Sequence, residues 1–425
     1  MKEFEKREIK NGVSLVAVPA SRFKTNEVSV SFATKLSEKT ASVNSLLINL
    51  LASCSEAYPD MLSLNRKLEM LYGAGIVSTV TKEGDCQLLT VYISSLDDRF
   101  ALDNESISLE CLKLLTELIF RPHFGADGNF TDGDIEREKR ILCEKIEREK
   151  NEKRLYALRR LEEEMFSGEA YSANALGKTE LVKAVTKEQL KTAYNDLLKS
   201  SRIQITSVGA ADIDEIAGII QSAFDKVERQ YAEIEKVKLT PYADKVKTVE
   251  ERQEIKQGKL VLGFRVNMEC DDENKDAMRM FSDIFGGGPY SKLFMNVREK
   301  LSLCYYCSAR YYKNNNCIII QCGCEEENMD KAVDEILNQL EEIKNGSFEY
   351  EFKSSLSGMC DSFVSVYDDS TLLLSWYLRQ IFDNETVAPD SAVEAFRNIK
   401  FDDVKKCASL LSLDTVYKLM AKEEK

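Results

Sequence analysis

The sequence predicts an α+β fold made of two homologous units. Runs of β-branched residues that alternate with polar residues predict strands, and apolar residues three or four positions apart predict amphipathic helices. The order of these elements recurs after about 230 residues, which indicates a duplication. A charged segment with little apolar periodicity separates the two copies. The length of 425 residues is sufficient for two such units, each with a sizeable core.

The first unit is expected to span residues 1–228. The patterns predict strands at 13–20, 27–34 and 202–210, and a strand pair over 75–95 that turns near Glu83 and Gly84. They predict helices at 42–54, 61–75, 107–120, 186–198 and 212–227. Residues 134–166 carry Glu and Lys at spacings of three or four, and are expected to form one long charged helix or a pair of helices.

Residues 229–257 are charged, contain Pro241 and are expected to form a linker. The second unit is expected to span 258–425. Its predicted elements are strands at 259–266, 304–312 and 316–324 and helices at 271–285, 329–343 and 349–366. Further helices are expected to complete the chain.

Two segments show the duplication most clearly. RKLEMLYGAGIVSTVTKEGDCQLLTVYIS (66–94) and NVREKLSLCYYCSARYYKNNNCIIIQCGC (296–324) each predict a helix, a tight junction, a strand, a polar turn and a second strand. A further helix is expected after each segment. The sequence therefore predicts two copies of one α+β unit within a single chain.

Composition excludes several classes of function. The net charge of −14 disfavours a nucleic-acid-binding protein, because phosphate contacts require clustered Lys and Arg. No apolar run approaches the length of roughly 18 to 20 residues that a membrane span requires. The start, MKEFEKREIK, lacks the apolar region of a signal peptide, so a cytoplasmic location is expected.

The chain has 12 cysteines, and five of them cluster in sequence. These are Cys304, Cys307, Cys317, Cys322 and Cys324. Thiolates at such spacings can hold zinc, and alternate residues of a strand, such as Cys322 and Cys324, share a face. The alternative interpretation is that they are buried free thiols in a reducing compartment, and both interpretations remain open.

The chain has a single histidine, His123, in the predicted loop IFRPHFGAD. A lone loop histidine is more often structural or solvated than catalytic. Any mechanism that requires two histidines is therefore excluded, whatever the fold.

The stretch FGGGPYSKLF (285–294) resembles a phosphate-binding loop only superficially. It has no Gly-Lys-Ser/Thr, Pro289 lacks an amide donor, and the glycines follow a helix rather than a strand. We expect a helix–turn–helix junction in which glycine supplies a positive φ and Pro289 begins the next helix.

This stretch and its surroundings resemble the C-terminal half of the insulinase-like M16 peptidases. The shared pattern comprises Gly-Gly, Ser291-x-Leu293-Phe294, Arg298-Glu299-x-Leu301 and Leu303-x-Tyr305, with Ser302 where the family usually has glycine. Asn11-Gly12-Val13 and Gln257-x-x-Leu260-x-Leu262-Gly263-Phe264 match strands that begin the two halves of the family. The resemblance implies two α/β-roll domains, each a mostly antiparallel sheet with helices on one side, as in the LuxS/MPP-like metallohydrolase fold.

The same resemblance implies a zinc site, whose ligands this chain lacks. M16 peptidases bind zinc through His-x-x-Glu-His on a helix of the first half and through a later glutamate. Ser55–Pro59 is similar to the family's Thr-Glu-Lys-Tyr-Pro, and this register places Ser45 and Asn49 at the histidines and Ile48 at the general base. Lys145 then falls at the third ligand, with Glu144 beside it. We therefore expect no metal cofactor and no hydrolysis by this chain alone.

The family's second half contributes an arginine and a tyrosine that contact the substrate backbone. The resemblance places these roles on Arg298 and Tyr305, with Tyr306 as a further candidate. Arginine offers fixed donors to peptide carbonyls, and tyrosine offers a donor on a rigid ring. The alternative is that Arg298 pairs with a neighbouring carboxylate and Tyr305 packs between sheet and helix.

Three hypotheses for function follow. The first is a noncatalytic M16-like subunit that binds polypeptide and works with a zinc-bearing M16 chain, or as a homodimer. The second is a self-associating scaffold without a peptide role. The third is a metal or redox function of the cysteine cluster.

Overall fold

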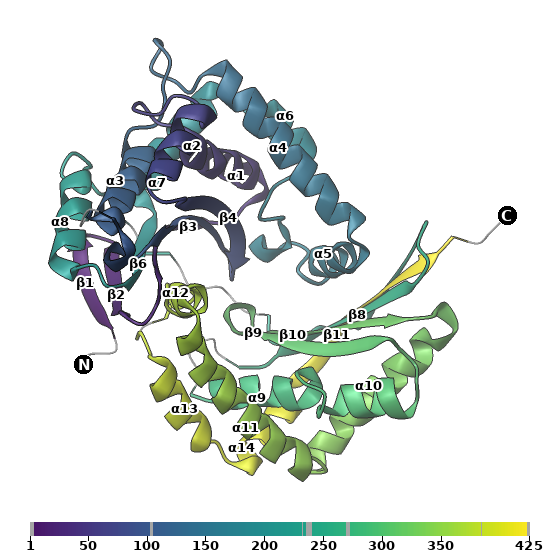
Figure 1. Cartoon of the computed structure of the whole chain (residues 1–425). Helices are drawn as coiled ribbons and strands as arrows, with labels where there is room; N and C mark the ends of the chain where they lie inside the picture. The colour runs from purple at the N-terminus through teal and green to yellow at the C-terminus, as the bar shows by residue number, and fades with distance from the viewer. Residues whose placement is uncertain are drawn as a thin grey trace. The chain divides into compact units, whose positions relative to one another are not determined.

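The computed structural model describes residues 4–102, 105–231, 233–234, 240–268, 273–383 and 385–422 (Figure 1). The chain forms two compact units. Unit 1 comprises Met1–Glu147, Ala173–Glu235 and Ser365–Pro389. Unit 2 comprises Arg148–Ser172, Lys236–Val364 and Asp390–Lys425. Each unit contains a sheet covered by helices, which confirms the α+β prediction.

The two sheets share one order of five strands, and the sheet of unit 1 has β1 as an additional edge strand. Unit 1 contains β1 (Glu5–Lys10), β2 (Val13–Pro19), β3 (Thr25–Lys35), β4 (Gly75–Glu83), β5 (Cys86–Leu96) and β6 (Arg202–Gly209), in the order β1-β2-β6-β3-β5-β4. Unit 2 contains β7 (Lys247–Gln253), β8 (Gly258–Val266), β9 (Tyr306–Tyr312), β10 (Cys317–Cys324) and β11 (Leu411–Ala421), in the order β7-β11-β8-β10-β9. The pairs β2–β6 and β7–β11 are parallel, and the other described pairs are antiparallel. The predicted duplication is therefore visible in the strand order.

Helices cover one face of each sheet. In unit 1 they are α1 (Glu38–Ser53), α2 (Met61–Met70), α3 (Ile107–Phe120), α4 (Asp132–Asn151), α6 (Thr179–Ala184), α7 (Lys187–Ser200) and α8 (Ile213–Phe224). In unit 2 they are α9 (Lys275–Gly286), α10 (Met329–Lys344), α11 (Glu349–Ser365), α13 (Pro389–Arg397) and α14 (Phe401–Ser409). Among the described residues, no helix has both the length and the apolar character needed to cross a bilayer.

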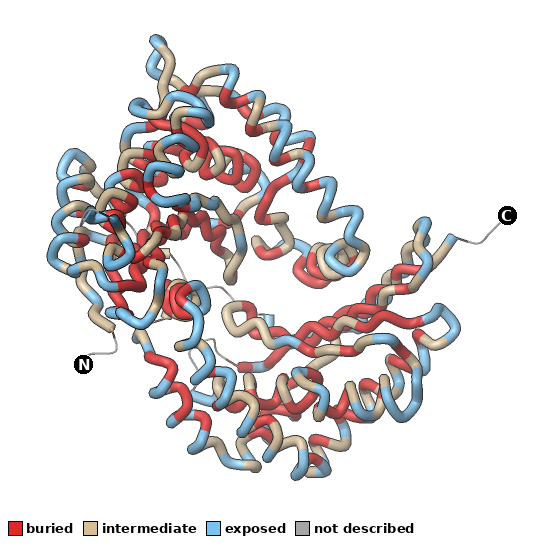
Figure 2. The backbone as a smooth tube through the Cα atoms, viewed as in Figure 1, coloured by how far each residue is buried: buried red, intermediate tan, exposed pale blue. Residues whose placement is uncertain are grey.

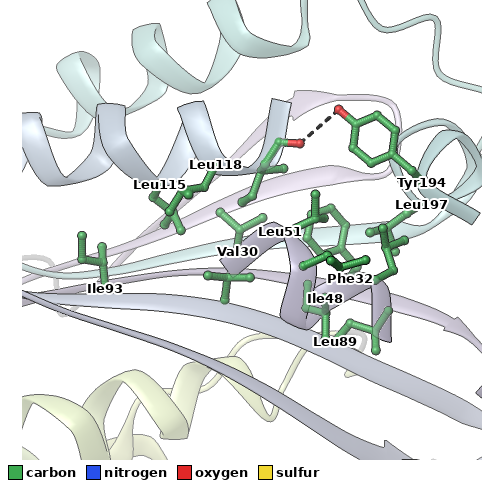
Figure 3. Packing of buried hydrophobic residues seen from close by; sticks show 14 of the residues in the cluster. Val30, Phe32, Ile48, Leu51, Leu89, Ile93, Leu115, Leu118, Tyr194 and Leu197 are labelled. Atoms are coloured by element: carbon green, nitrogen blue, oxygen red, sulfur yellow. Dashed lines mark hydrogen bonds between the residues drawn. The ribbon is translucent and has the colours of Figure 1, made fainter. Parts of the chain in front are cut away.

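The core of unit 1 lies between its sheet and the helices α1, α3 and α7. Val30 and Phe32 of β3 point toward Ile48 and Leu51 of α1 (Figure 3). The Tyr194 hydroxyl donates a hydrogen bond to the carbonyl oxygen of Ile119 at 3.1 Å, which satisfies a polar group inside this core. Buried and exposed residues alternate along many of the helices (Figure 2), as amphipathic patterning requires, whereas the central strands β3, β8 and β10 are buried almost throughout.

The opposite face of each sheet is covered by a helix from the other half of the sequence. Helix α5 (Lys153–Met165) packs on the sheet of unit 2 through Leu161 and Met165. Helix α12 (Ser370–Leu378) packs on the sheet of unit 1 through Leu373 and Tyr377. The prediction of helices on one side is thus incomplete. A Cβ at Gly263 of β8 would lie 2.4 Å from the Met165 sulfur, so glycine there permits the close approach of α5.

Several elements differ from the predictions. The chain ends in the central strand β11 where helices were expected, and β7 lies within the expected linker. Strand β7 is the polar sequence KTVEERQ at a sheet edge, so its pattern is weak. Strand β1 was not predicted. Residues 232 and 235–239 of the expected linker, and the first residues of the helix expected at 271–285, lie outside the described residues.

The prediction that glycine supplies a positive φ after α9 is wrong. Gly287 has φ −85°, and neither Gly286 nor Gly288 has a positive φ. A Cβ at Gly286 would lie 2.4 Å from the backbone nitrogen of Ala309 in β9. The requirement is therefore close packing of helix against strand, not an unusual backbone conformation.

Candidate functional site

The positions that the predicted register places at the zinc-binding motif lie on α1, and none of them is a histidine, a cysteine or a carboxylate. Ser45 is fully buried, and its hydroxyl donates to the Ala175 carbonyl oxygen at 2.9 Å. The Gln87 amide donates to the same carbonyl at 2.6 Å and to the Ser45 oxygen at 3.2 Å. Ser45 is therefore part of a neutral hydrogen-bond network.

The other aligned positions are equally unsuited to a cation. Ile48 is fully buried within the apolar core, and the Asn49 side-chain oxygen accepts a hydrogen bond from Ser78 at 2.9 Å. Lys145 is exposed on α4, and the adjacent Glu144 lies 3.8 Å from Arg140. Serine, asparagine and lysine cannot replace two imidazoles and a carboxylate as zinc ligands, and isoleucine cannot act as the general base.

His123 forms a structural contact, and the structure adds a neighbour that the sequence did not reveal. Its Nδ1 lies 3.0 Å from Asp134 Oδ2, and Cys54 is close to both residues. Burial opposes ionisation of Asp134, but hydrogen bonds from Thr131, His123 and Arg137 outweigh it and lower the Asp134 pKa. Burial, followed by the Asp134 charge, raises the pKa of the Cys54 thiol. A thiol that resists ionisation is a poor nucleophile, so this trio is unsuited to cysteine catalysis.

Arg298 and Tyr305 line one pocket of unit 2, which we call the Arg298 pocket. Its volume is about 440 Å³, and its lining residues are Arg298, Glu299, Ser302, Leu303, Cys304, Tyr305, Glu325 and Asn328. Arg298 lies in the π-helical segment η3 (Leu293–Lys300), a type of helix that often occurs at functional sites. The structure thus brings together two of the three residues predicted to contact substrate.

The alternative was that Arg298 pairs with a carboxylate and Tyr305 packs between sheet and helix, and the structure matches only its first part. The Arg298 guanidinium lies 4.5 Å from the Phe294 ring centroid and 3.5 Å from Glu299. Tyr305 does not pack between sheet and helix, because it is 62% exposed, and its hydroxyl donates to Glu325 at 3.3 Å. The tyrosine ring is therefore available to a ligand.

Tyr306 does not belong to the Arg298 pocket. It lies directly opposite Gly323 in the β9–β10 pairing, and the Arg154 guanidinium of α5 stacks 4.5 Å from its ring centroid. Burial raises the pKa of Tyr306 to about 12. Successive strand residues point to opposite faces, which separates Tyr306 from the side where Cys307 lies.

The five clustered cysteines divide between the two faces of the sheet. Cys304, Cys307 and Cys322 place their sulfur atoms within 4.8 Å of one another. Cys324 shares the face of Cys322, whereas Cys317 packs against α5 on the opposite face. The spacing of the strand residues predicts this division, but only the strand pairing brings Cys307 opposite Cys322.

The chain is similar to several known proteins over most of its length. A family model described as "Peptidase M16 inactive domain" matches residues 184–357. A Bacillus subtilis (strain 168) protein named "Probable inactive metalloprotease YmfF" is 28% identical over 416 residues, which cover 97% of this chain and 96% of that protein.

Solved structures agree with this similarity. A conserved protein from Enterococcus faecalis V583 superposes with a TM-score of 0.88 and 25% identity, with full coverage of both chains. The peptidase M16 inactive domain from Pseudomonas fluorescens superposes with a TM-score of 0.77 at 16% identity, covering 99% of this chain and 98% of that one. The second likeness shows the fold alone.

Proposed function

Because the chain is a homologue of the M16 peptidases without their two-histidine motif, we propose that it binds extended polypeptide without cleaving it. We propose further that it acts as the noncatalytic partner of a zinc-bearing M16 chain. The observation that carries the proposal is that Arg298 and Tyr305 line one pocket beside the start of strand β9.

Strand β9 is suited to pairing with a peptide. It is the last strand of its sheet, and no strand in the described part of the chain pairs with its outer side. An extended peptide can add to such an edge through backbone hydrogen bonds. Arg298 would donate to peptide carbonyls, and the exposed Tyr305 ring would contact a side chain.

The chemistry of α1 supports binding without cleavage. Hydrolysis in this family requires a metal-activated water, and Ser45, Ile48 and Asn49 provide neither a metal ligand nor a base. The proposal therefore assigns recognition to unit 2 of this chain and bond cleavage to a different chain. A self-associating scaffold remains the alternative, and it requires no role for Arg298.

Peptide binding is tested with fluorescein-labelled, carboxymethylated α-lactalbumin, an unfolded polypeptide, by fluorescence anisotropy. Arg298→Ala and Tyr305→Ala are each expected to weaken binding about tenfold or more, because a hydrogen bond to a charged group contributes about 1.5–3 kcal/mol and a buried ring a similar amount. Arg397→Ala and Tyr350→Ala are matched controls, since both residues are exposed in unit 2 outside the pocket.

Unchanged affinity in both pocket variants would overturn the peptide-binding proposal. Chelator-sensitive cleavage of the probe by the purified chain would overturn the noncatalytic one. The partner proposal predicts that an affinity-tagged chain retains, from its own cells, a second protein with His-x-x-Glu-His. Recovery of further copies of this chain alone would instead favour the self-associating scaffold.

A further inference from the structure

Three thiols converge behind the Arg298 pocket. Cys307 of β9 and Cys322 of β10 are directly opposite each other, and Cys304 precedes β9 on the chain. Their sulfur atoms lie within 4.8 Å of one another, and the three residues are buried. Thiolates around a metal at a bond length of about 2.3 Å lie about 4 Å apart, so this spacing suits a shared ion.

The ligand set is soft. The group consists of sulfur alone, without a carboxylate or imidazole among the three. Thiolates select Zn²⁺, Cu⁺ and iron–sulfur clusters, whereas Mg²⁺ and Ca²⁺ require oxygen. A mononuclear ion fits three sulfurs that already lie this close together.

The three thiols must lose their protons when they bind a metal ion. Metal binding would release the thiol protons to solvent as the sulfur–metal bonds form. No electron transfer is involved.

The Arg298 pocket provides a route for entry. Cys304 lines this pocket with Arg298 and Tyr305, whereas Cys307 and Cys322 do not line it. Cys324 lies on the same face of β10, and its thiol interacts with that of Cys322. It is the candidate fourth ligand for an ion that prefers tetrahedral coordination.

We propose that Cys304, Cys307 and Cys322 form a thiolate site for a thiophilic d¹⁰ metal ion, Zn²⁺ or Cu⁺, beside the Arg298 pocket. With Zn²⁺ the site recruits Cys324 as a fourth ligand. With Cu⁺ three sulfurs are sufficient. The site is distinct from the aligned zinc position on α1 and does not depend on peptide binding.

The test measures metal content in full-length protein purified anaerobically with a non-thiol reductant. Wild-type protein is loaded separately with Zn²⁺ and with Cu⁺, desalted and analysed by mass spectrometry of the metal. We expect close to one equivalent per chain of the preferred ion. Cys304→Ala/Cys322→Ala is expected to retain essentially none. Cys317→Ala is the matched control, because Cys317 is as buried as Cys322 and lies on the same strand but on the other face.

The fourth ligand distinguishes the two ions. Cys324→Ala is expected to lower retention of Zn²⁺ at least tenfold, because tetrahedral zinc takes a fourth thiolate, and to leave retention of Cu⁺ unchanged. A charge-transfer absorption band with Co²⁺ in wild-type protein, absent from the double variant, would report sulfur ligation directly. Metal content below one tenth of an equivalent in fully reduced, folded wild-type protein overturns the proposal. Equal metal content in the wild type and the folded double variant also overturns it.

Discussion

The β4–β5 hairpin of unit 1 and the β9–β10 hairpin of unit 2 pair their strands in the same register. Ile76 is opposite Ile93 in the first hairpin, and Tyr306 is opposite Gly323 at the equivalent place in the second. Before each hairpin the chain passes through a residue with positive φ, 58° at Tyr72 and 51° at Ser302. The backbone of the duplicated unit is therefore retained even where glycine is absent.

Key side chains of the Arg298 pocket have no counterparts in unit 1. Leu68, Ala74 and Gly75 of unit 1 occupy the positions that correspond to Arg298, Cys304 and Tyr305 of unit 2. The pocket, the thiols and the exposed tyrosine thus belong to unit 2 alone. The comparison teaches that the fold supplies equivalent positions, whereas individual side chains decide which of them can bind a ligand.

Helices α5 and α12, which cover the second face of each sheet, also pack through different kinds of contact. Helix α5 packs on its sheet through apolar residues and through buried Arg265 of β8, which donates to the Met165 carbonyl of α5 at 2.6 Å and to Glu169, just after the helix, at 2.7 Å. Arg265 also donates to Asp414 of β11 at 2.9 Å. Helix α12 contacts unit 1 through apolar residues and a hydrogen bond of 3.0 Å from Gln204 to the Tyr377 carbonyl. The contact of α5 should therefore depend more strongly on charge.

The largest effect is expected from Arg265→Ala. Removal of one partner leaves Glu169 and Asp414 without their cation, and loss of a buried ion-pair partner typically costs about 3–5 kcal/mol. Gln204→Ala removes the neutral anchor of α12 and is expected to cost about 1 kcal/mol. Urea unfolding combined with hydrogen exchange of the α5 and α12 amides measures both effects. Equal losses in the two variants would contradict the proposed difference between the helices.

Lowering the pH should destabilise the packing of α5 but not that of α12. Burial opposes ionisation of Glu251, but hydrogen bonds from Tyr156 and Tyr417 outweigh it and lower the Glu251 pKa. This carboxylate therefore contributes stability above the unfolded-state pKa of about 4.3, and the contribution is lost as pH falls through the lower folded-state pKa. Burial raises the pKa of Glu27, which accepts a hydrogen bond from Ser370 of α12, so protonation there does not favour unfolding.

Trp376 of α12 is the single tryptophan of the chain, so its fluorescence reports on unit 1. As pH falls from about 4.3 through the lower folded-state pKa of Glu251, we expect lower protection factors for the α5 amides while the Trp376 emission stays constant. Glu251→Gln is the control, and it should reduce the pH dependence of α5 exchange. If the Trp376 emission shifts at a higher pH than the exchange of the α5 amides changes, the prediction that α5 is the more acid-sensitive helix is wrong.

The smallest effect is expected at Ser302. Its left-handed conformation costs a side chain about 1–2 kcal/mol, and glycine avoids this cost at some loss of entropy in the unfolded chain. Ser302→Gly should therefore stabilise unit 2 by up to about 1 kcal/mol, measured as a higher urea midpoint. Ser302→Val should destabilise it. Tyr72→Gly should raise the free energy of unfolding by less, because the Tyr72 hydroxyl accepts a hydrogen bond from the Leu102 amide and glycine cannot.

Most elements could be predicted from the sequence because their periodicity is local. The alternation in β3 and β10 and the amphipathic patterns of α1 and α10 each identify the element without knowledge of its neighbours. Strands β1 and β7 escaped prediction because their sequences, EKREIK and KTVEERQ, are polar, and β11 was missed although LSLDTVYKLMA contains apolar residues in alternation. The linker composition of β7 gave no sign that it would complete a sheet.

The sequence by itself determined the duplication and the absence of a two-histidine zinc motif, since both depend only on residue identity and order. The tertiary structure decided which side chains meet. Helices α5 and α12 pack on sheets from the other half of the sequence because each sheet has a second apolar face that must be covered. The tertiary structure placed Cys307 opposite Cys322 and Arg298 beside Tyr305 because strand pairing and a π-helical turn, not sequence spacing, set those distances.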